Sequence, residues 1–374
     1  MTPCYIYNIK ELNDRISSII RIFNNIPLTY SIKANAFLIE YLPNEVSHIE
    51  ACSPGELSIC IRKKINPEKI IYSGVMKEYQ DIKRAIEYGV DIVTIESYRQ
   101  YELVKKIAEE EKKIVSIILR LTSGNQFGMD IDAISDVLGD AIIDKYIIVK
   151  GYHYYSGTQK NKKSEFEKDL CDLESIISTM HNQYNFFPDL VEYGPGIAVD
   201  YFREPYEDVD ISTMQIASSV VSEFASKYPL TIEMGRCIAA TCGRYETSVM
   251  DIKKNKDIKY VIVDGGIHHV KYYKQIMSMN KPPIKQDPIR GSKTEKYTIC
   301  GSLCTTADVM VREQLLQELE IGDKLIFDRV GAYSISESAS LFLSREMPSV
   351  YIEDINGNIN MLREPIPTEK INCP

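Results

Sequence analysis

The sequence predicts an α/β fold in which a (β/α)8 TIM barrel is joined to a second, mainly β domain in the C-terminal part of the chain. Short β-rich apolar runs alternate with helix-like segments through the first two thirds of the 374 residues, a pattern typical of a parallel α/β structure. We count eight such runs, the strand number of the barrel. Beyond about residue 236, β-like runs separated by Gly, Pro and Asn turn signals predominate.

The expected barrel covers residues 9–236. Amphipathic segments with apolar residues at helical spacing lie between its strands, for example at 78–89, 97–113, 164–180 and 218–228. The expected strands are LTYSIK (28–33), HIEAC (48–52), KIIYS (69–73), VDIVT (90–94), IVSIILRL (114–121), YIIVKGYHY (146–154), LVEYG (190–194) and LTIEM (230–234).

Residues 1–8 together with 237–374 are expected to form the β-rich domain. The polar stretch 279–296 contains three prolines and reads as an exposed loop. The expected strands of this domain lie in YVIVDGG (260–266), KYTICG (296–301), KLIFDRVG (324–331) and SVYIEDINGNI (349–359).

Composition narrows the class of protein. A hydrophobic fraction of 44% and a charged fraction of 26% are those of an ordinary soluble globular protein. No apolar run reaches the roughly 18 residues of a membrane span, and the N-terminus lacks a signal-peptide pattern, so the cytoplasm is the expected location and no membrane partner is expected. A net charge of -9 disfavours nucleic acid as a partner. None of the cysteines forms a C-x-x-C pair, so no metal site is predicted.

Reactive side chains fall where barrel chemistry is expected. Active sites of TIM-barrel enzymes lie at the C-terminal ends of the strands. At those ends the sequence places Lys33, Ser53, Ser73, Glu96, Arg120, His153 with Tyr155, Gly194 with Gly196, and Glu233 with Arg236.

Lys33 and Glu233 are the strongest candidates. Lys33, in YSIKANAF, follows a strand that should be buried, where an ammonium is costly unless it is paired or used covalently. Desolvated lysines of this kind form Schiff bases, although a surface lysine after an edge strand is the alternative. Glu233 ends the last barrel strand, where a carboxylate can keep a cofactor ring nitrogen protonated. Its alternative role is a salt bridge to Arg236 or Arg120.

The remaining candidate residues of the barrel are suited to binding an anion and to contacting an aromatic ring. Gly194 and Gly196 follow the seventh strand, and glycines let backbone N–H groups approach an anion, although a tight turn needs them too. Arg236 follows the eighth strand, close to the usual phosphate site of this fold. His153 and Tyr155 alternate along one strand and point to the same side, either to stack on a bound ring or to fill the core.

Taken together, these segments resemble the fold type III pyridoxal phosphate decarboxylases, the family of ornithine, arginine and diaminopimelate decarboxylases. The similar motifs run nearly end to end. They are TPCYIYN (2–8), YSIKAN (30–35), ACSPGEL (51–57), YSGVMK (72–77), IES (95–97), QFGMD (126–130), GYHYYSGTQ (151–159), EYGPG (192–196), EMGR (233–236), CGSLCTTAD (300–308) and GAYSISESASLF (331–342).

The resemblance implies an enzyme with pyridoxal 5'-phosphate held as a Schiff base on Lys33. Glu233 would pair with the pyridine nitrogen, and Cys304 would protonate the α-carbanion once carbon dioxide has left. The resemblance also implies a head-to-tail homodimer with shared active sites, in which the β-rich domain completes the site and the Cys304 motif comes from the partner chain. The cofactor-binding set would be Lys33, His153, Tyr155, Thr158, Gly194, Gly196, Glu233, Gly235, Arg236 and Tyr333, with Arg120 toward the substrate.

The sequence departs from the family pattern at several positions. Tyr155 stands where better-known members carry the His that stacks on the cofactor, and Thr158 replaces a Ser. Pro195 replaces the middle glycine of a GGG turn, and Met234 replaces a Pro. Stacking can survive the first change because both rings are aromatic.

Thr305 is the most informative departure. The diamine-forming and diaminopimelate enzymes carry Asp or Glu there, and a neutral hydroxyl cannot pair with a distal ammonium. The sequence therefore favours a branch of specialised metabolism acting on carrier-linked or conjugated amino acids. His268 and His269 would bind that substrate or lie on the surface.

Three other functions compete with this interpretation. One is decarboxylation of free ornithine, lysine or diaminopimelate, against which Thr305 argues. A racemase would share the barrel and the lysine, but Glu233 and the Cys304 motif argue against it. A non-catalytic cofactor carrier of the single-barrel type would lack the long C-terminal domain.

Overall fold

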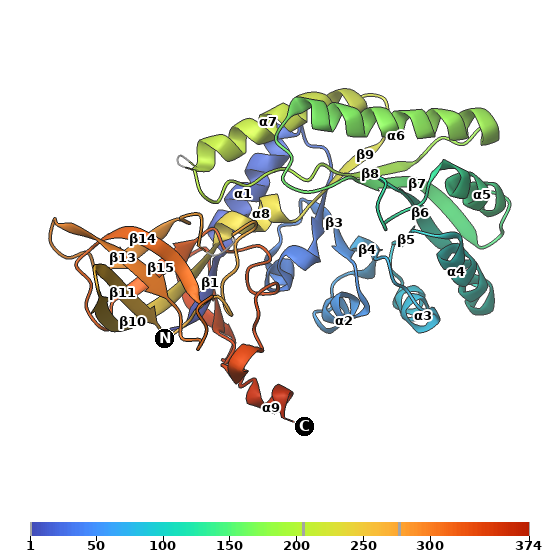
Figure 1. Ribbon diagram of the computed structural model, residues 1–374. Coiled ribbons are helices and arrows are strands. Elements are labelled where there is room, and N and C mark those ends of the chain that lie inside the picture. The colour runs from blue at the N-terminus through green and yellow to red at the C-terminus, as the bar shows by residue number, and fades with distance from the viewer. Residues whose placement is uncertain (1, 204–205, 276–277, 374) are drawn as a thin grey trace. The chain divides into compact units, whose positions relative to one another are not determined.

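The computed structural model describes residues 2–203, 206–275 and 278–373, which form two compact units (Figure 1). The barrel unit comprises residues 16–199 and 208–238. The β-rich unit comprises residues 1–15, 200–207 and 239–374.

Eight parallel strands close into a barrel, and the pairing of β2 with β9 completes the ring. The fold class expected from the sequence, a TIM barrel with a second, mainly β domain, is therefore confirmed. The barrel strands are β2 (Leu28–Ser31), β3 (Val46–Ala51), β4 (Ile70–Tyr72), β5 (Ile92–Ile95), β6 (Val115–Leu121), β7 (Ile147–Tyr155), β8 (Leu190–Gly194) and β9 (Leu230–Met234).

The helices between the strands have clear sequence signals at their ends. Helix α3 begins with a capping box between Glu78 and Asp81 and ends at Gly89, whose φ of 88° is a left-handed conformation that glycine adopts without strain. Among the described residues, none of the helices combines the length and apolar composition that crossing a membrane requires. The helices before and within the barrel are α1 (Ile9–Ile22), α2 (Pro54–Arg62), α3 (Tyr79–Tyr88), α4 (Tyr98–Glu111), α5 (Ile131–Ala141), α6 (Lys163–Tyr184), α7 (Tyr206–Ala225) and α8 (Arg236–Ala239).

The first barrel strand is shorter than its apolar run suggests. Strand β2 ends at Ser31, and Lys33 lies in the 3-10 turn η1 (Ile32–Ala34). Asn35 then accepts the backbone N–H of Phe37 and starts a second 3-10 segment, η2 (Ala36–Tyr41). The buried side chains of Ile32 and Ala34 anchor this turn, so the Lys33 side chain is the one that emerges from it.

The strands of the β-rich unit belong to one mostly antiparallel sheet with the path β14-β13-β11-β10-β1-β16-β17, and β15 pairs with both β10 and β12. Its strands are β1 (Cys4–Asn8), β10 (Gly243–Asn255), β11 (Ile258–Val263), β12 (Ile284–Asp287), β13 (Thr294–Cys300), β14 (Val309–Gln317), β15 (Lys324–Asp328), β16 (Ser349–Glu353) and β17 (Ile359–Arg363), and the short helix α9 (Glu369–Asn372) follows.

Two sequence expectations for this unit were wrong. The stretch 279–296 is not only a loop, because it contains β12, which pairs with β15, and the start of β13. The run 349–359 is not one strand. It turns at Asp354, whose carboxylate accepts the backbone N–H groups of Asn356 and Asn358, and β16 therefore pairs with β17 as a hairpin.

Candidate active site

Lys33 lies beside two buried carboxylates at the C-terminal end of the barrel. Its Nζ is 3.0 Å from Oε2 of Glu50 and 3.6 Å from Oε1 of Glu233. The Sγ of Cys52 lies 3.5 Å from the same nitrogen. The amine is partly exposed, whereas both carboxylates are buried, so two fixed negative charges hold it at the surface of the site.

Glu233 is a buried carboxylate with three polar partners. Ser31 donates a short hydrogen bond to its Oε1, and Nε2 of His153 lies 3.1 Å from its Oε2. Burial raises the pKa of Glu233, but the Lys33 ammonium and the contact with His153 outweigh burial and hold the pKa well below its usual range. These contacts therefore favour the ionised form of Glu233 inside the barrel.

The strand register explains why these side chains meet. Ser31 lies opposite Glu50, Thr29 opposite Glu233, and His153 opposite Glu192 in neighbouring parallel strands. Laterally paired residues point to the same face of a sheet. The alternation of each strand thus sends several polar side chains into the barrel interior.

The loops after β7 and β8 form a close-fitting backbone cradle. Gly196 has φ of 59°, and a Cβ built there would stand 1.8 Å from the carbonyl oxygen of Gly157. A Cβ on Gly194 would stand 2.6 Å from the ring of Tyr155. The two loops are joined by hydrogen bonds from the N–H of Lys160 to Gly196 and from the N–H of residue 198 to Lys160, each 2.9 Å long. Only glycine allows this approach at both positions.

The next barrel strand, β9, leads directly into helix α8. Met234 and Gly235 separate Glu233 from Arg236, and a Cβ on Gly235 would stand 2.9 Å from Cβ of Ala34 beside Lys33. The lysine turn and the arginine that starts α8 are therefore packed against each other through this glycine.

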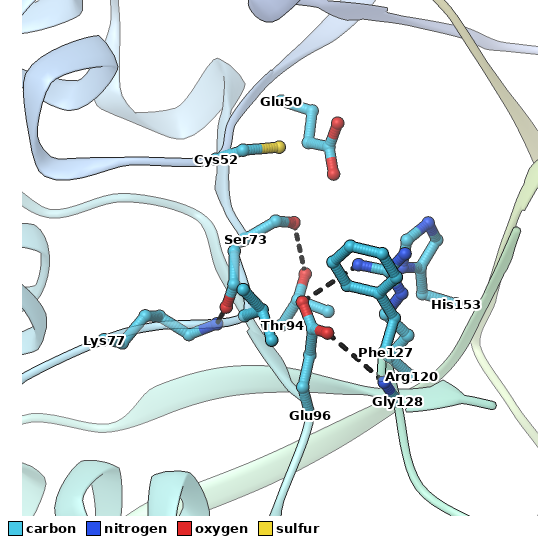
Figure 2. Close-up of polar contacts among 12 residues, drawn as sticks. Glu50, Cys52, Ser73, Lys77, Thr94, Glu96, Arg120, Phe127, Gly128 and His153 are labelled. Carbon is cyan, nitrogen blue, oxygen red and sulfur yellow. Dashed lines mark hydrogen bonds and ion pairs between the residues drawn. The ribbon is translucent and has the colours of Figure 1, made fainter. Parts of the chain in front are cut away.

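Arg120 is engaged by a neighbour inside the barrel, as Figure 2 shows. One of its guanidinium nitrogens lies 2.9 Å from Oε1 of Glu96, and Oε2 of Glu96 accepts the backbone N–H of Gly128 at 3.2 Å. The ring of Phe127 covers the guanidinium at 4.8 Å. The charge of Arg120 is thus already paired, which limits what it can offer a substrate carboxylate.

Lys77, unlike Lys33, is a buried lysine of the barrel unit (Figure 2). Its Nζ donates to the carbonyl oxygen of Gly74 at 2.5 Å, and none of the ion pairs among the described residues includes it. Burial lowers the pKa of Lys77 to about 8, and the negative charge of Glu96 opposes this only in part.

We expect Lys77→Met to raise the free energy of unfolding near neutral pH. The lysine pKa is lowered from 10.5 to about 8, so its charged form costs up to about 3 kcal/mol, at about 1.4 kcal/mol per pKa unit. This cost is fully present below the folded-state pKa and fades as the pH rises toward the usual lysine value. Denaturant unfolding near neutral pH and at about pH 10 checks it, with the exposed Lys106→Met as the control. A less stable Lys77→Met protein at neutral pH would contradict the expectation.

A cavity of about 690 Å³ opens beside the loop after β7. Its walls include Thr122, Thr158, Lys160 and Asp169. Neither Lys33 nor Glu233 lines it, so we do not place the reacting group there. The carboxylate of Asp169 accepts hydrogen bonds from Lys160, from Ser156 and from Tyr193, which stiffens the loop that carries Thr158.

Five sequence-predicted residues belong to the β-rich unit, namely Cys304, Thr305, Tyr333, His268 and His269. Cys304 is exposed on a turn that Asp308 holds together. The two carboxylate oxygens of Asp308 accept the backbone N–H groups of Ile267 at 2.9 Å and Leu303 at 2.7 Å.

The surface alternative for the two histidines was wrong, because both are buried. His269 donates from Nε2 to the carbonyl of Glu346 at 2.7 Å, and its Nδ1 lies 3.0 Å from the hydroxyl of Tyr245. Both ring nitrogens of His269 are therefore engaged in hydrogen bonds within the β-rich unit. Neither ring nitrogen of His268 has a hydrogen-bond partner among the described residues.

Sequence reasoning missed Glu50, Cys52, Glu192 and Lys77 in the barrel. Glu50 lies in HIEAC and Glu192 in LVEYG. A charged residue that alternates with apolar residues along a strand is usually interpreted as pointing to solvent. In a barrel whose outer face is covered by helices, however, an isolated Glu within a β-rich run is a signal of an inward polar side chain.

A family model described as the pyridoxal binding domain of pyridoxal-dependent decarboxylases matches residues 9–240. The chain therefore belongs to the pyridoxal-dependent decarboxylases. Its cofactor is pyridoxal phosphate, and the resemblance seen in the sequence is confirmed.

Two curated relatives and one solved structure show what the chain is similar to. It is 27% identical to the L-glutamyl-[BtrI acyl-carrier protein] decarboxylase of Niallia circulans, over 97% of this chain and 91% of that protein. It is also 27% identical to the 2-[(L-alanin-3-ylcarbamoyl)methyl]-2-hydroxybutanedioate decarboxylase of Staphylococcus aureus, over 92% of both. The diaminopimelate decarboxylase of M. jannaschii in complex with L-lysine superposes with a TM-score of 0.87 at 22% identity, over 100% of this chain and 91% of that one.

The barrel residues fit pyridoxal phosphate on three counts. Lys33 offers a primary amine at the barrel mouth, and Glu233 offers a buried anion 3.6 Å from it. At Gly194 and Gly196 the backbone can approach a bound anion more closely than it could if either position carried a side chain. A reactive amine, a carboxylate for the ring nitrogen and an anion cradle are the three features that this cofactor requires.

Proposed function

We propose that this enzyme decarboxylates an amino acid whose distal end is conjugated to another group or carried by a protein. The observation that carries the proposal is the absence of an available negative charge in residues 301–308, the turn that carries Cys304. Residues 301–308 contain one acidic side chain, Asp308, which is buried with both oxygens bonded to backbone. The neighbouring Thr305 is neutral, so this turn favours a substrate without a distal ammonium.

Other curated relatives, such as that of Bacteroides thetaiotaomicron, are diaminopimelate decarboxylases, but the two described above support the same conclusion. The printed name of one describes a glutamyl group on an acyl-carrier protein, and that of the other describes an alanine joined through an amide to a hydroxybutanedioate. Neither name describes a free diamine precursor. We therefore favour conjugated substrates over free ornithine, lysine or diaminopimelate, and we place the enzyme in specialised metabolism.

We assign the barrel roles as follows. Lys33 would bind the cofactor covalently, and Glu233 would hold the proton on the ring nitrogen. When bound, pyridoxal phosphate supplies a conjugated ring that takes up the electron pair left by the departing carboxyl group. The backbone cradle and the start of α8 would hold the phosphate, and the aromatic ring of Tyr155 would cover one face of the cofactor. The phosphate-holding residues would be Thr158, Gly194, Gly196, Gly235, Arg236 and Tyr333.

We also assign roles outside the barrel. The β-rich unit would complete the active site in a homodimer, with Cys304 supplied by the partner chain. We expect the enzyme to act in the cytoplasm. The Sγ of Cys304 would deliver the proton that replaces the carboxyl group on the α-carbon. His268, Arg120 and Thr305 would face the substrate.

Cys304→Ala is expected to lower turnover by roughly 10²–10⁴-fold, the usual contribution of a positioned proton donor. Cofactor absorbance should stay unchanged because the cofactor is bound elsewhere. Carbon dioxide release and the visible spectrum, measured on the same preparation, check both statements. Cys171→Ala, which removes another exposed thiol, is the control. Unchanged turnover in the Cys304 variant would defeat the assigned role.

A carbon dioxide release screen tests the function itself. It should cover free L- and D-amino acids, the same acids joined to small amides, and a glutamyl-loaded acyl-carrier protein. We expect release from a conjugated or carrier-linked substrate. Release from lysine, ornithine or diaminopimelate alone would show that the interpretation of Thr305 is wrong, and inversion of configuration without release would identify a racemase.

A further inference from the structure

Glu192 is a buried carboxyl group in the middle of strand β8. Its side chain faces the barrel interior, because it lies opposite His153 on β7 and Thr231 on β9. The residue is 0% exposed. Neither carboxyl oxygen has a hydrogen-bond partner among the described residues.

The other inward carboxylates have partners of opposite charge or hydrogen-bond donors. Arg120 pairs with Glu96, and Lys33 pairs with both Glu50 and Glu233. None of the ion pairs among the described residues includes Glu192. An ionised Glu192 would thus be an uncompensated charge in a region shielded from water, which is strongly unfavourable.

The groups around Glu192 make its ionisation still less favourable. Burial raises its pKa well above the usual value, and the negative charges of Glu233 and Glu50 raise it further. Thr29 on β2 and the Lys33 ammonium act in the opposite direction without reversing the shift. His153, the lateral neighbour, is committed to Glu233 through its Nε2.

We propose that Glu192 is an uncharged carboxylic acid in the cofactor-free protein and a positioning residue that leaves Glu233 as the ionised member of the pair. The two acids lie on adjacent strands and divide one proton and one negative charge between them. The statement that this arrangement presents one fixed anion to the ring nitrogen of the cofactor rests on the proposed function. The protonation of Glu192 does not.

The proton on Glu192 has a measurable effect on stability. Its pKa is raised in the folded protein, so the folded state holds a proton that the unfolded chain releases. Between the usual glutamate pKa and the folded-state value, the folding equilibrium constant therefore falls by up to about tenfold for each unit that the pH rises. Glu233 has the opposite sign, because its pKa is lowered and its contribution is lost only as the pH falls.

Glu192→Gln removes this titration while keeping size and polarity. In the apoprotein we expect the variant to become progressively more stable than the wild type as the pH rises, by up to about tenfold in the folding constant per pH unit. The matched control is Glu109→Gln on the exposed side of α4, which should follow the wild-type curve. A difference between Glu192→Gln and wild type that does not change with pH would overturn the proposal.

Infrared spectroscopy of the apoprotein near neutral pH locates the proton directly and does not depend on activity. A protonated carboxylic acid has a carbonyl stretch separate from those of carboxylates and amides, and ¹³C-glutamate labelling assigns it. We expect this band in the wild type and in Glu233→Gln, and its loss in Glu192→Gln. Absence of the band in the wild type, which needs no variant to fold, would overturn the proposal, as would a band that survives Glu192→Gln and disappears in Glu233→Gln.

The outcomes separate this inference from the proposed function. An acid band at Glu192 without carbon dioxide release from any substrate would defeat the function alone. Carbon dioxide release from a protein that lacks the band would defeat the assignment of Glu192 alone.

Discussion

Replacing Lys33 by Ala is expected to abolish turnover and the visible absorbance of the bound cofactor together. Covalent attachment of the cofactor would depend on this amine, so we expect the loss in turnover to exceed about 10³-fold. In the structure the Nζ of Lys33 lies 3.0 Å from Glu50 and 3.6 Å from Glu233, so replacing Lys33 by Ala also removes the ammonium that these two carboxylates share. Carbon dioxide release and the absorbance spectrum after reconstitution with pyridoxal phosphate are the measurements.

Lys33→Arg is the matched variant for this experiment. Arginine keeps a positive charge beside the two carboxylates, so the fold should be retained, but it does not form the covalent bond. We expect Lys33→Arg to be as inactive as Lys33→Ala, and the surface variant Lys106→Ala to match the wild type. Activity in Lys33→Arg would mean that Lys33 serves only as an ion-pair partner.

Glu233→Gln is expected to lower turnover by about 10²–10³-fold, which is the size that removal of one electrostatic stabilising group in an active site produces. An amide cannot hold the proton on a ring nitrogen, and it leaves one fewer negative charge beside Lys33. Steady-state rates of carbon dioxide release at saturating cofactor check the expectation.

The control for Glu233→Gln is Glu109→Gln, which makes the same chemical change on the exposed side of helix α4. Circular dichroism should show that both variants fold. If Glu233→Gln released carbon dioxide at the wild-type rate, the negative charge at this position would not be part of the reaction, and the assigned role of Glu233 would be wrong.

The barrel could be predicted from the sequence because its signal is repeated. Each strand is a short apolar run at the expected spacing, and the two last strands, 190–194 and 230–234, match the structure residue for residue. Lys33 and Glu233 could be found for the same reason, since both follow from where a strand ends. The structure brings these two side chains to within 3.6 Å of each other.

The pairing of Lys33 with Glu50 could not be predicted, because it depends on the strand register. Glu50 and Ser31 meet only when β2 and β3 pair as they do, and a shift of one residue would send Glu50 to the outer face. Glu192 escaped notice because the glutamate of LVEYG reads as inward only once the outer face of the barrel is known to be covered by helices. Its neutrality follows only from what surrounds it in three dimensions.

The β-rich unit was harder to predict than the barrel. Strand β12 is four residues of mixed polarity between prolines, and it exists because β15 offers it a hydrogen-bonding edge. His268 and His269 read as a polar pair, yet both are buried, and His269 is held by Tyr245 and a carbonyl far along the chain. Such contacts join segments that sequence patterns treat separately.

The most direct test of the central claim is to trap the cofactor on the enzyme. Borohydride reduction of the reconstituted protein, followed by peptide mass spectrometry, identifies the residue that carries pyridoxal phosphate. The site geometry predicts a single modified peptide that contains Lys33, and no modification in Lys33→Arg. A modified residue other than Lys33, for example the buried Lys77, or no covalent adduct at all, would contradict the assignment.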